Sequence, residues 1–196
     1  MIVDLEKEYP RALAEGPAVL KKGGIIVFPT DTVYGLGGDA RSPEVLGKIY
    51  KIKERERGKP LAVVMSGLGM IREWCEVYEE GGNIMREHLP GPYTFILKLK
   101  EGKPLAGQKD KIGVRIPNHF FLRRLVLEFG APVIATSANI SGKKDPVRFS
   151  EVDAGIIAAA DLAINGGETA LRQPSTVVDL VERRILRKGA GEFEFK

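Results

Sequence analysis

Five cationic side chains occupy alternate positions in one short stretch of the chain. They are Lys51, Lys53, Arg55, Arg57 and Lys59, with glutamates between the later ones. On extended backbone, alternate side chains point to one side about 6.6–6.8 Å apart, so such a row could follow a triphosphate or a nucleic-acid backbone. Gly58 and Pro60 indicate that at least its second half is not helical. The alternative is a solvated loop whose cations pair with its own glutamates.

A second group of polar residues follows a short apolar run. Residues 25–28 are typical of a buried strand, and residues 29–37, Pro-Thr-Asp-Thr-Val-Tyr-Gly-Leu-Gly, place hydroxyls and glycine amides after it. Such groups often contact a ligand at a strand end, although a turn with self-satisfied hydroxyls is the alternative. Residues 35–40 also fit a dinucleotide fingerprint, but the helix start signal comes only at Ser42-Pro43. We therefore exclude an NAD site here.

Other polar residues lie at or within predicted strands. Residues 135–139, Ala-Thr-Ser-Ala-Asn, predict a turn whose hydroxyls, amide and backbone N–H groups suit a phosphate. Thr94 and Ser175 stand where apolar strands begin. Arg115 lies within an apolar strand, where an arginine needs either a structural carboxylate or the carboxylate of a substrate. Neither a Walker A motif nor a nucleophile elbow is present.

Helices and strands must alternate to position these residues. Apolar periodicity and start and stop signals predict helices at 10–22, from 43 after a Ser42 cap, 69–78, 82–89, 119–129 and 150–160 after a Ser150 cap, and strands at 25–28, 61–65, 93–100, 112–117, 131–138, 161–165, 175–180 and 184–188. The residues between 28 and 42 read as a glycine-rich loop. We expect one α/β domain over residues 1–196, with a twisted mixed parallel/antiparallel sheet flanked by helices.

Composition narrows the class of protein. Hydrophobic residues make up 43% and charged residues 29%, which is typical of a soluble globular chain with a substantial core. The single Cys75 excludes an internal disulfide and a cysteine-based zinc site, and His88 and His119 have no metal-ligand spacing. No signal peptide or apolar run of about 18 residues is present, so we expect a cytoplasmic protein without a membrane span.

Seven motifs, in order, resemble those of the YrdC-like threonylcarbamoyl-AMP synthases. They are PTDTVYGLG at 29–37, K-x-R at 53–55 followed by Pro60-Leu61, LPGPYT at 89–94, VRIP at 114–117, TSANISG at 136–142, STVVDL at 175–180 and ILRKG at 185–189. Lys59, Val64 and Asp145 depart from the common pattern. The resemblance covers the chain from about residue 20 to 190.

This resemblance implies a nucleotidyltransferase that joins L-threonine, bicarbonate and ATP, with Mg²⁺, into threonylcarbamoyl-AMP and pyrophosphate. The product would pass to partner proteins that modify tRNA. The resemblance implies catalytic roles for Lys53, Arg55, Ser137 and Asn139. It implies threonine-binding roles for Thr32, Arg115, Ala135 and Ser175, and ATP-binding roles for Arg55, Lys59, Thr94, Lys111, Ser137, Asp145 and Arg187. No residue is expected to bind a metal by itself.

Two alternatives stay open at this point. A non-catalytic module could bind tRNA or double-stranded RNA through a basic face, although aromatic residues are only 7% and no stacking motif is present. A paralogue could act on another acyl or carbamoyl adenylate. Direct RNA binding is also compatible with the synthase itself.

Overall fold

A computed structural model describes residues 1–195 of the protein. Its strands are β1 (Ile2–Asp4), β2 (Ile26–Phe28), β3 (Gly35–Gly37), β4 (Ala62–Val64), β5 (Tyr93–Lys98), β6 (Lys111–Arg115), β7 (Val133–Ser137), β8 (Leu162–Asn165), β9 (Thr176–Asp179) and β10 (Arg184–Arg187). Its helices are α1 (Tyr9–Lys21), α2 (Pro43–Ile52), α3 (Leu68–Trp74), α4 (Glu79–His88), α5 (Phe120–Phe129) and α6 (Ala154–Ala159), with a 3₁₀ turn at Phe149–Glu151.

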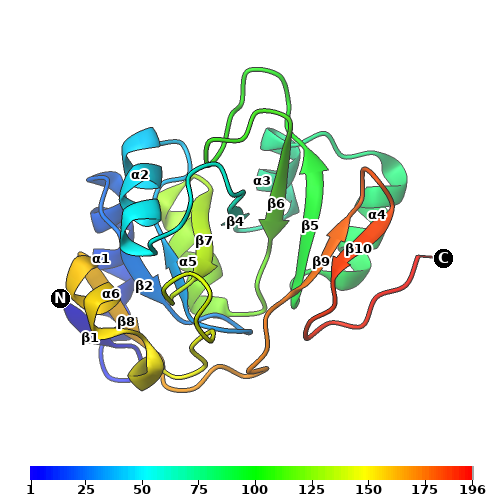
Figure 1. The fold of residues 1–196 in the computed structure, drawn as a ribbon. Coiled ribbons are helices and arrows are strands. Elements are labelled where there is room, and N and C mark those ends of the chain that lie inside the picture. Colours follow the sequence, from blue (N-terminus) through cyan, green and yellow to red (C-terminus); the bar gives the residue numbers. More distant parts are fainter. Residues whose placement is uncertain (196) are drawn as a thin grey trace.

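All these strands join one sheet in the order β1-β8-β2-β3-β7-β4-β6-β5-β9-β10 (Figure 1). The pairs β1·β8, β2·β8, β4·β6 and β5·β9 are parallel, and the other neighbours are antiparallel. The expected mixed sheet is therefore confirmed, and β5·β6 and β9·β10 are among its antiparallel pairs. Within residues 1–195, no helix is long and apolar enough to cross a bilayer.

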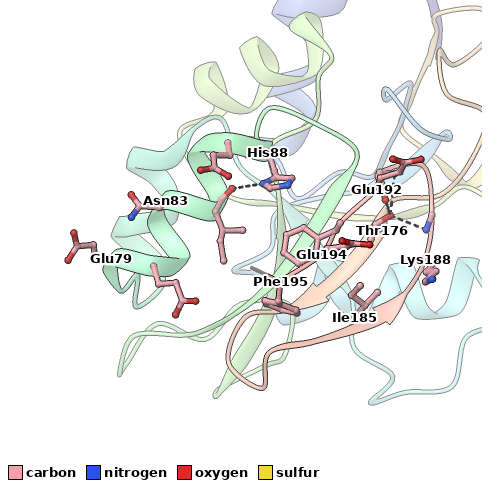
Figure 2. A pocket seen from close by; sticks show the side chains of 15 residues that line it. Glu79, Asn83, His88, Thr176, Ile185, Lys188, Glu192, Glu194 and Phe195 are labelled. Carbon is pink, nitrogen blue, oxygen red and sulfur yellow. Dashed lines mark hydrogen bonds between the residues drawn. The ribbon is translucent and has the colours of Figure 1, made fainter.

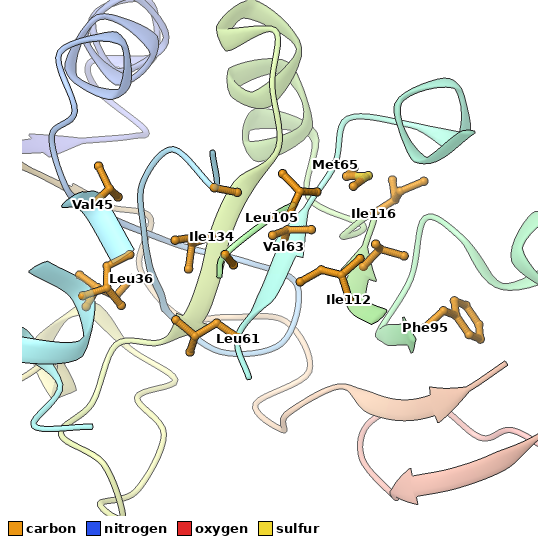
Figure 3. Close-up of a cluster of buried hydrophobic side chains, with 14 of the residues drawn as sticks. Leu36, Val45, Leu61, Val63, Met65, Phe95, Leu105, Ile112, Ile116 and Ile134 are labelled. Atoms are coloured by element: carbon orange, nitrogen blue, oxygen red, sulfur yellow. The ribbon is translucent and has the colours of Figure 1, made fainter. Parts of the chain in front are cut away.

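Helices cover both faces of the sheet. On one face, α1 and α5 pack together, with Leu20 and Leu125 in one apolar cluster. On the other face lies a larger cluster that takes side chains from α2, α3, α4 and α6 and from most strands. Figure 3 shows part of it, including Val63, Ile134 and Phe95. Successive residues of a strand point to opposite faces, so β4 gives Val63 to this cluster and Val64 to the other.

The start signals predicted from the sequence were right for α2 and wrong for α6. Ser42 caps α2 by accepting a hydrogen bond from the backbone N–H of Val45 at 3.2 Å. Ser150 caps no α-helix, because residues 149–151 form the 3₁₀ turn instead. The cap of α6 is Asp153, whose carboxylate accepts from the N–H of Gly155 at 2.8 Å.

The expected glycine-rich loop contains the strand β3, which links the two halves of the sheet. It pairs antiparallel with β2 on one side and with β7 on the other. A Cβ atom on Gly37 would lie 1.8 Å from the carbonyl oxygen of Ile134, and one on Gly35 would lie 2.4 Å from the ring of Phe28. Glycines are therefore needed here for close strand packing, not for a loop. The strand β1 was also missed from the sequence.

Candidate active site

A cavity of about 390 Å³ opens on the sheet where no helix covers it. Phe95, Val114 and Val178 point toward α3 and α4, so their neighbours in the strands point to the opposite face. The floor of the cavity on that face is made by three residues with little or no side chain, namely Ala62, Gly113 and Ala135. A Cβ on Gly113 would lie 3.0 Å from Thr94 Cγ2, so any larger residue would begin to fill the cavity.

Arg115 lies at one end of this cavity and is held from behind. Its Nη2 donates to Asp31 Oδ1 at 2.9 Å, and its Nη1 donates to Thr32 Oγ1 at 3.0 Å. The other oxygen of Asp31 accepts from the N–H of Asn118 at 3.1 Å. Burial lowers the pKa of Arg115 and the carboxylate of Asp31 raises it. The sequence had left two kinds of partner open for Arg115, a structural carboxylate or the carboxylate of a substrate. The structure shows a structural carboxylate, that of Asp31.

The guanidinium of Arg115 nevertheless keeps a donor for a ligand. Its Nε is buried and has no hydrogen-bond partner among the described residues, and the side chain lines the cavity. Asp31 and Thr32 each accept from one guanidinium N–H group, so further N–H groups remain for an anion bound in the cavity. This end of the cavity is suited to a carboxylate.

Lys53 is buried beneath the turn that follows β7 and does not line the cavity. Its side chain is 1% exposed, and its Nζ donates to the backbone oxygens of Ser137 and Asn139 and to Asn139 Oδ1, the latter two at 2.7 and 3.1 Å. Burial, and then the nearby cation of Arg55, lower the pKa of Lys53 to about 8, while Asp145 raises it. The ammonium therefore fixes the Ser137–Asn139 turn, while Ser137 lines the cavity.

The row of cations expected from the alternating spacing does not form. The helix α2 continues through Lys51, Lys53 caps its end in a helical conformation, and Glu54 turns the chain with φ +50°. Of the five cations, Arg55 lines the cavity, and its buried Nε lacks a partner among the residues described. Lys59 forms an ion pair with Glu56 at 3.0 Å, as the solvated-loop alternative predicts. The prediction of an extended row was therefore wrong.

The opposite wall of the cavity joins β5, β9 and β10. Thr94 Oγ1 lies 2.8 Å from Ser175 Oγ. Arg187 donates from Nε and Nη2 to the carbonyl oxygen of Ser175 at 3.1 and 2.8 Å. These contacts hold a third guanidinium at the cavity, after those of Arg115 and Arg55, on the wall across from the Ser137–Asn139 turn.

The structure brings most of the predicted residues together. Those that line the cavity are Arg55, Thr94, Arg115, Ala135, Ser137, Asp145, Ser175 and Arg187. Lys53, Asn139 and Thr32 contact lining residues from behind. Lys59 and Lys111 do not line the cavity, and Lys111 instead pairs with Glu182 at 2.6 Å and Asp179 at 3.6 Å.

Sequence reasoning missed several lining residues, of which Tyr34 is the largest. Its hydroxyl donates to the carbonyl oxygen of Gly167 at 2.8 Å and accepts from the N–H of Gly166 at 3.0 Å. Thr30 and Gly35 also line the cavity. All three belong to the motif at 29–37, from which only Thr32 had been selected. Pro174, Val177 and Leu186 were missed as well, and they lie beside predicted residues in the chain.

Metal ligands are sparse in this cavity. Among residues 1–195, no three His, Cys, Asp or Glu side chains are grouped so that they could hold a metal ion. Asp145 is the acidic side chain in the lining, and its Oδ1 accepts from Asn139 Nδ2 at 3.1 Å. A single carboxylate fits an Mg²⁺ ion that arrives on the phosphates of a nucleotide.

A larger groove of about 1510 Å³ lies between α4 and the end of the chain. Its lining includes Glu79, His88 and Phe195 and none of the predicted site residues (Figure 2). The chemistry of the lining therefore identifies the smaller cavity as the candidate active site.

Comparisons with known proteins identify the family of this chain. The family model Sua5/YciO/YrdC, described as "Telomere recombination", matches residues 18–189. A threonylcarbamoyl-AMP synthase of Xanthomonas campestris is 33% identical over 175 residues, which are 87% of this chain and 94% of that protein.

Solved structures extend the similarity to three dimensions. The P. abyssi Sua5 structure complexed with L-threonine has a TM-score of 0.89 and 31% sequence identity. The match covers 96% of this chain and 57% of the Sua5 chain. The structure of E. coli YciO has a TM-score of 0.82 and 27% identity over 93% of this chain and 91% of that one. This chain therefore belongs to the Sua5/YciO/YrdC family.

Proposed function

We propose that the chain is a threonylcarbamoyl-AMP synthase, a nucleotidyltransferase that uses L-threonine, bicarbonate and ATP. The observation that carries this proposal is Arg115, a buried guanidinium that lines the cavity and is anchored there by Asp31, with N–H groups that Asp31 and Thr32 do not use. An amino-acid carboxylate fits those donors. The name of the Xanthomonas relative and the threonine complex of P. abyssi Sua5 support the same substrate.

The reaction proceeds in two balanced steps. The amino nitrogen of threonine forms a bond to the carbon of bicarbonate, and water leaves, which gives a carbamate. An oxygen of the carbamate then bonds to the α-phosphorus of ATP, and the bond from that phosphorus to the bridging oxygen breaks. Pyrophosphate leaves with the electron pair, and threonylcarbamoyl-AMP remains.

The side chains of the cavity fit the charge that develops in the second step. Negative charge grows on the phosphoryl oxygens and on the departing pyrophosphate, and fixed cations stabilise it more in the transition state than in the ground state. We assign this role to Arg55 and Arg187, whose side chains line the cavity. Mg²⁺ on the phosphates, next to Asp145, would neutralise further charge when bound. No side chain has to act as a nucleophile.

Incubation with ATP, Mg²⁺, L-threonine and ¹⁴C-bicarbonate tests the proposal. We expect threonine-dependent release of pyrophosphate and ¹⁴C in an adenylate, with neither product when threonine or bicarbonate is omitted. Arg55→Met serves as the loss-of-function variant, and Lys51→Met, an exposed cation of the same segment, serves as the matched control. Pyrophosphate release that does not depend on threonine would refute the synthase.

The RNA-binding module is the competing function. It does not explain why Arg115 is buried at the cavity and held there by Asp31. Direct binding of tRNA or double-stranded RNA, transfer of the product to partner proteins and a cytoplasmic location are further proposals that go with the synthase. A gel-shift titration with tRNA and with duplex RNA tests the first of them, and binding without any synthesis would favour the module.

A further inference from the structure

The last described residues of the chain fold back over the beginnings of β5 and β9. Residues 189–195 contact Tyr93 and Thr176, and Figure 2 shows Glu192 beside Thr176. Thr176 follows Ser175 directly, and successive side chains of a strand point to opposite faces. One backbone segment therefore contacts the tail on one side and the cavity on the other.

Thr176 is the polar anchor of this tail. Its hydroxyl accepts from the N–H groups of Gly189 at 3.0 Å and Gly191 at 3.2 Å, and it donates to the carbonyl oxygen of Gly191. The side chain is 1% exposed. The N–H of Ala190 also donates to the carbonyl oxygen of Pro174 at 2.8 Å. Each of these bonds ends on the segment that carries Ser175.

Phe193 is the apolar anchor. It is 9% exposed although it lies near the end of the chain. Its ring centroid lies 5.1 Å from that of His88, 6.0 Å from Phe95 and 6.3 Å from Tyr93. The hydroxyl of Tyr93 donates to the carbonyl oxygen of Glu192 at 2.8 Å. Phe193 is therefore the residue through which the tail joins the apolar core.

The tail approaches too closely for any side chain at its glycines. A Cβ on Gly189 would lie 2.3 Å from the carbonyl oxygen of Pro174, and one on Gly191 would lie 2.4 Å from the ring of Tyr93. A shift of the tail would therefore move the segment at 174–176 with it.

That segment decides where Arg187 points. The guanidinium makes its bonds to the carbonyl oxygen and the hydroxyl of Ser175, the residue before the anchor. We propose that residues 189–195 form a clamp that positions Arg187 toward ATP, and that Thr176 and Phe193 are positioning residues that touch no substrate. The proposal rests on the proposed function.

Three substitutions test the clamp. Thr176→Val keeps the shape of the side chain and removes the hydroxyl, Thr176→Ser restores the hydroxyl, and Phe193→Ala removes the apolar anchor. We expect Thr176→Val and Phe193→Ala to raise the KM for ATP about fivefold or more. We expect a smaller rise in the KM for threonine, because the same segment carries Ser175, for which a threonine-binding role is expected, whereas Arg115 keeps its own contacts with Asp31 and Thr32. Thr176→Ser should stay near the wild type, as should Phe120→Ala, a control at an exposed position on α5.

A double-mutant cycle separates positioning from stability. If the clamp acts through Arg187, then Thr176→Val has little further effect on the KM for ATP in an Arg187→Ala background. Effects that multiply as for independent sites would overturn the proposal. So would a lower melting temperature with an unchanged KM for ATP.

Calorimetric titration with ATP measures the dissociation constant for ATP directly, so this test of the clamp does not depend on the reaction. Wild-type protein that binds ATP but makes no adenylate would refute the proposed function, and the same variants would still report on the clamp through their dissociation constants. If Thr176→Val does not fold at the assay temperature, Phe193→Ala and the titration at a lower temperature decide the question. Unchanged dissociation constants in a folded variant would overturn the clamp.

Discussion

Replacement of Lys53 by methionine should both destabilise the protein and abolish synthesis. Methionine retains most of the buried stem and removes the ammonium that binds the turn after β7. The backbone oxygens of Ser137 and Asn139 then lose a buried donor. Asn139 Oδ1 retains its bond from Ser137 Oγ at 2.6 Å, so the side-chain acceptor is not stranded. Two backbone acceptors therefore determine the loss.

The size of the effect follows from two opposing contributions. An unsatisfied buried acceptor costs about 1–3 kcal/mol. Against this, burial lowers the pKa of Lys53 to about 8, which means that keeping the ammonium charged in the folded wild type costs free energy. Methionine has no charge and removes that cost. We expect a net loss of about 2 kcal/mol in the free energy of unfolding. Lys53→Ala would add the cost of a cavity, about 2–5 kcal/mol for a large buried side chain, and would hide the effect of the charge.

Urea unfolding and adenylate synthesis measured on the same preparations check the prediction. A loss of 2 kcal/mol lowers the urea midpoint by about 1 M with an unchanged m-value. The matched controls are Lys51→Met, which should change neither quantity, and Arg55→Met, which should abolish synthesis with a stability change within about 0.5 kcal/mol. Lys53→Met with wild-type stability and wild-type synthesis would show that the ammonium does not hold the turn.

Three further results follow from the described contacts. Arg115→Lys should raise the KM for threonine more than the KM for ATP, because it keeps a charge beside the buried Asp31 but loses the free Nε, whereas equal changes in both constants would argue against a carboxylate site. The pKa of Lys53 is about 8 in the folded chain against an ordinary value of 10.5. The contribution of Lys53 to the free energy of unfolding should therefore rise by up to about 1.4 kcal/mol per pH unit between about pH 8 and 10.5, and it should be lost as the pH falls through 8. Urea melts across that range should show this rise in the wild type, and its persistence in Lys53→Met would contradict the assignment. Cys75 is 1% exposed and burial raises its pKa to about 12, so a thiol reagent at pH 8 should label it only when urea unfolds the chain; rapid labelling of the folded protein would contradict its burial.

Local patterns in the sequence were sufficient to predict most elements. The Ser42-Pro43 signal predicted the start of α2, and apolar runs identified β2 and β4. Such features depend on neighbours in the chain, so they can be read without a structure. Short strands without an apolar pattern were missed for the same reason, and β3, with its two glycines, is one of them.

The roles of the cations depended on tertiary contacts that spacing cannot show. Lys53 and Arg55 are two residues apart, yet one is buried under a turn and the other faces the cavity. The difference arises because α2 ends at Ile52 and Glu54 then turns the chain. Arg115 was correctly selected as an arginine that needs an anion. That Asp31 holds it and still leaves Nε free could be seen only in the folded chain.

Gly37 has a consequence for any saturation mutagenesis of this protein. No residue other than glycine fits there, because β3 pairs with β7 so closely that a Cβ would overlap the carbonyl of Ile134. Every substitution at this position would therefore score as null, as would loss of a substrate-binding arginine. A substitution at Gly37 and the loss of a substrate-binding arginine differ in the amount of folded protein. A substitution at Gly37 separates the halves of the sheet and therefore lowers that amount. An abundance readout beside the activity readout is thus needed before intolerance in the motif at 29–37 is assigned to substrate binding.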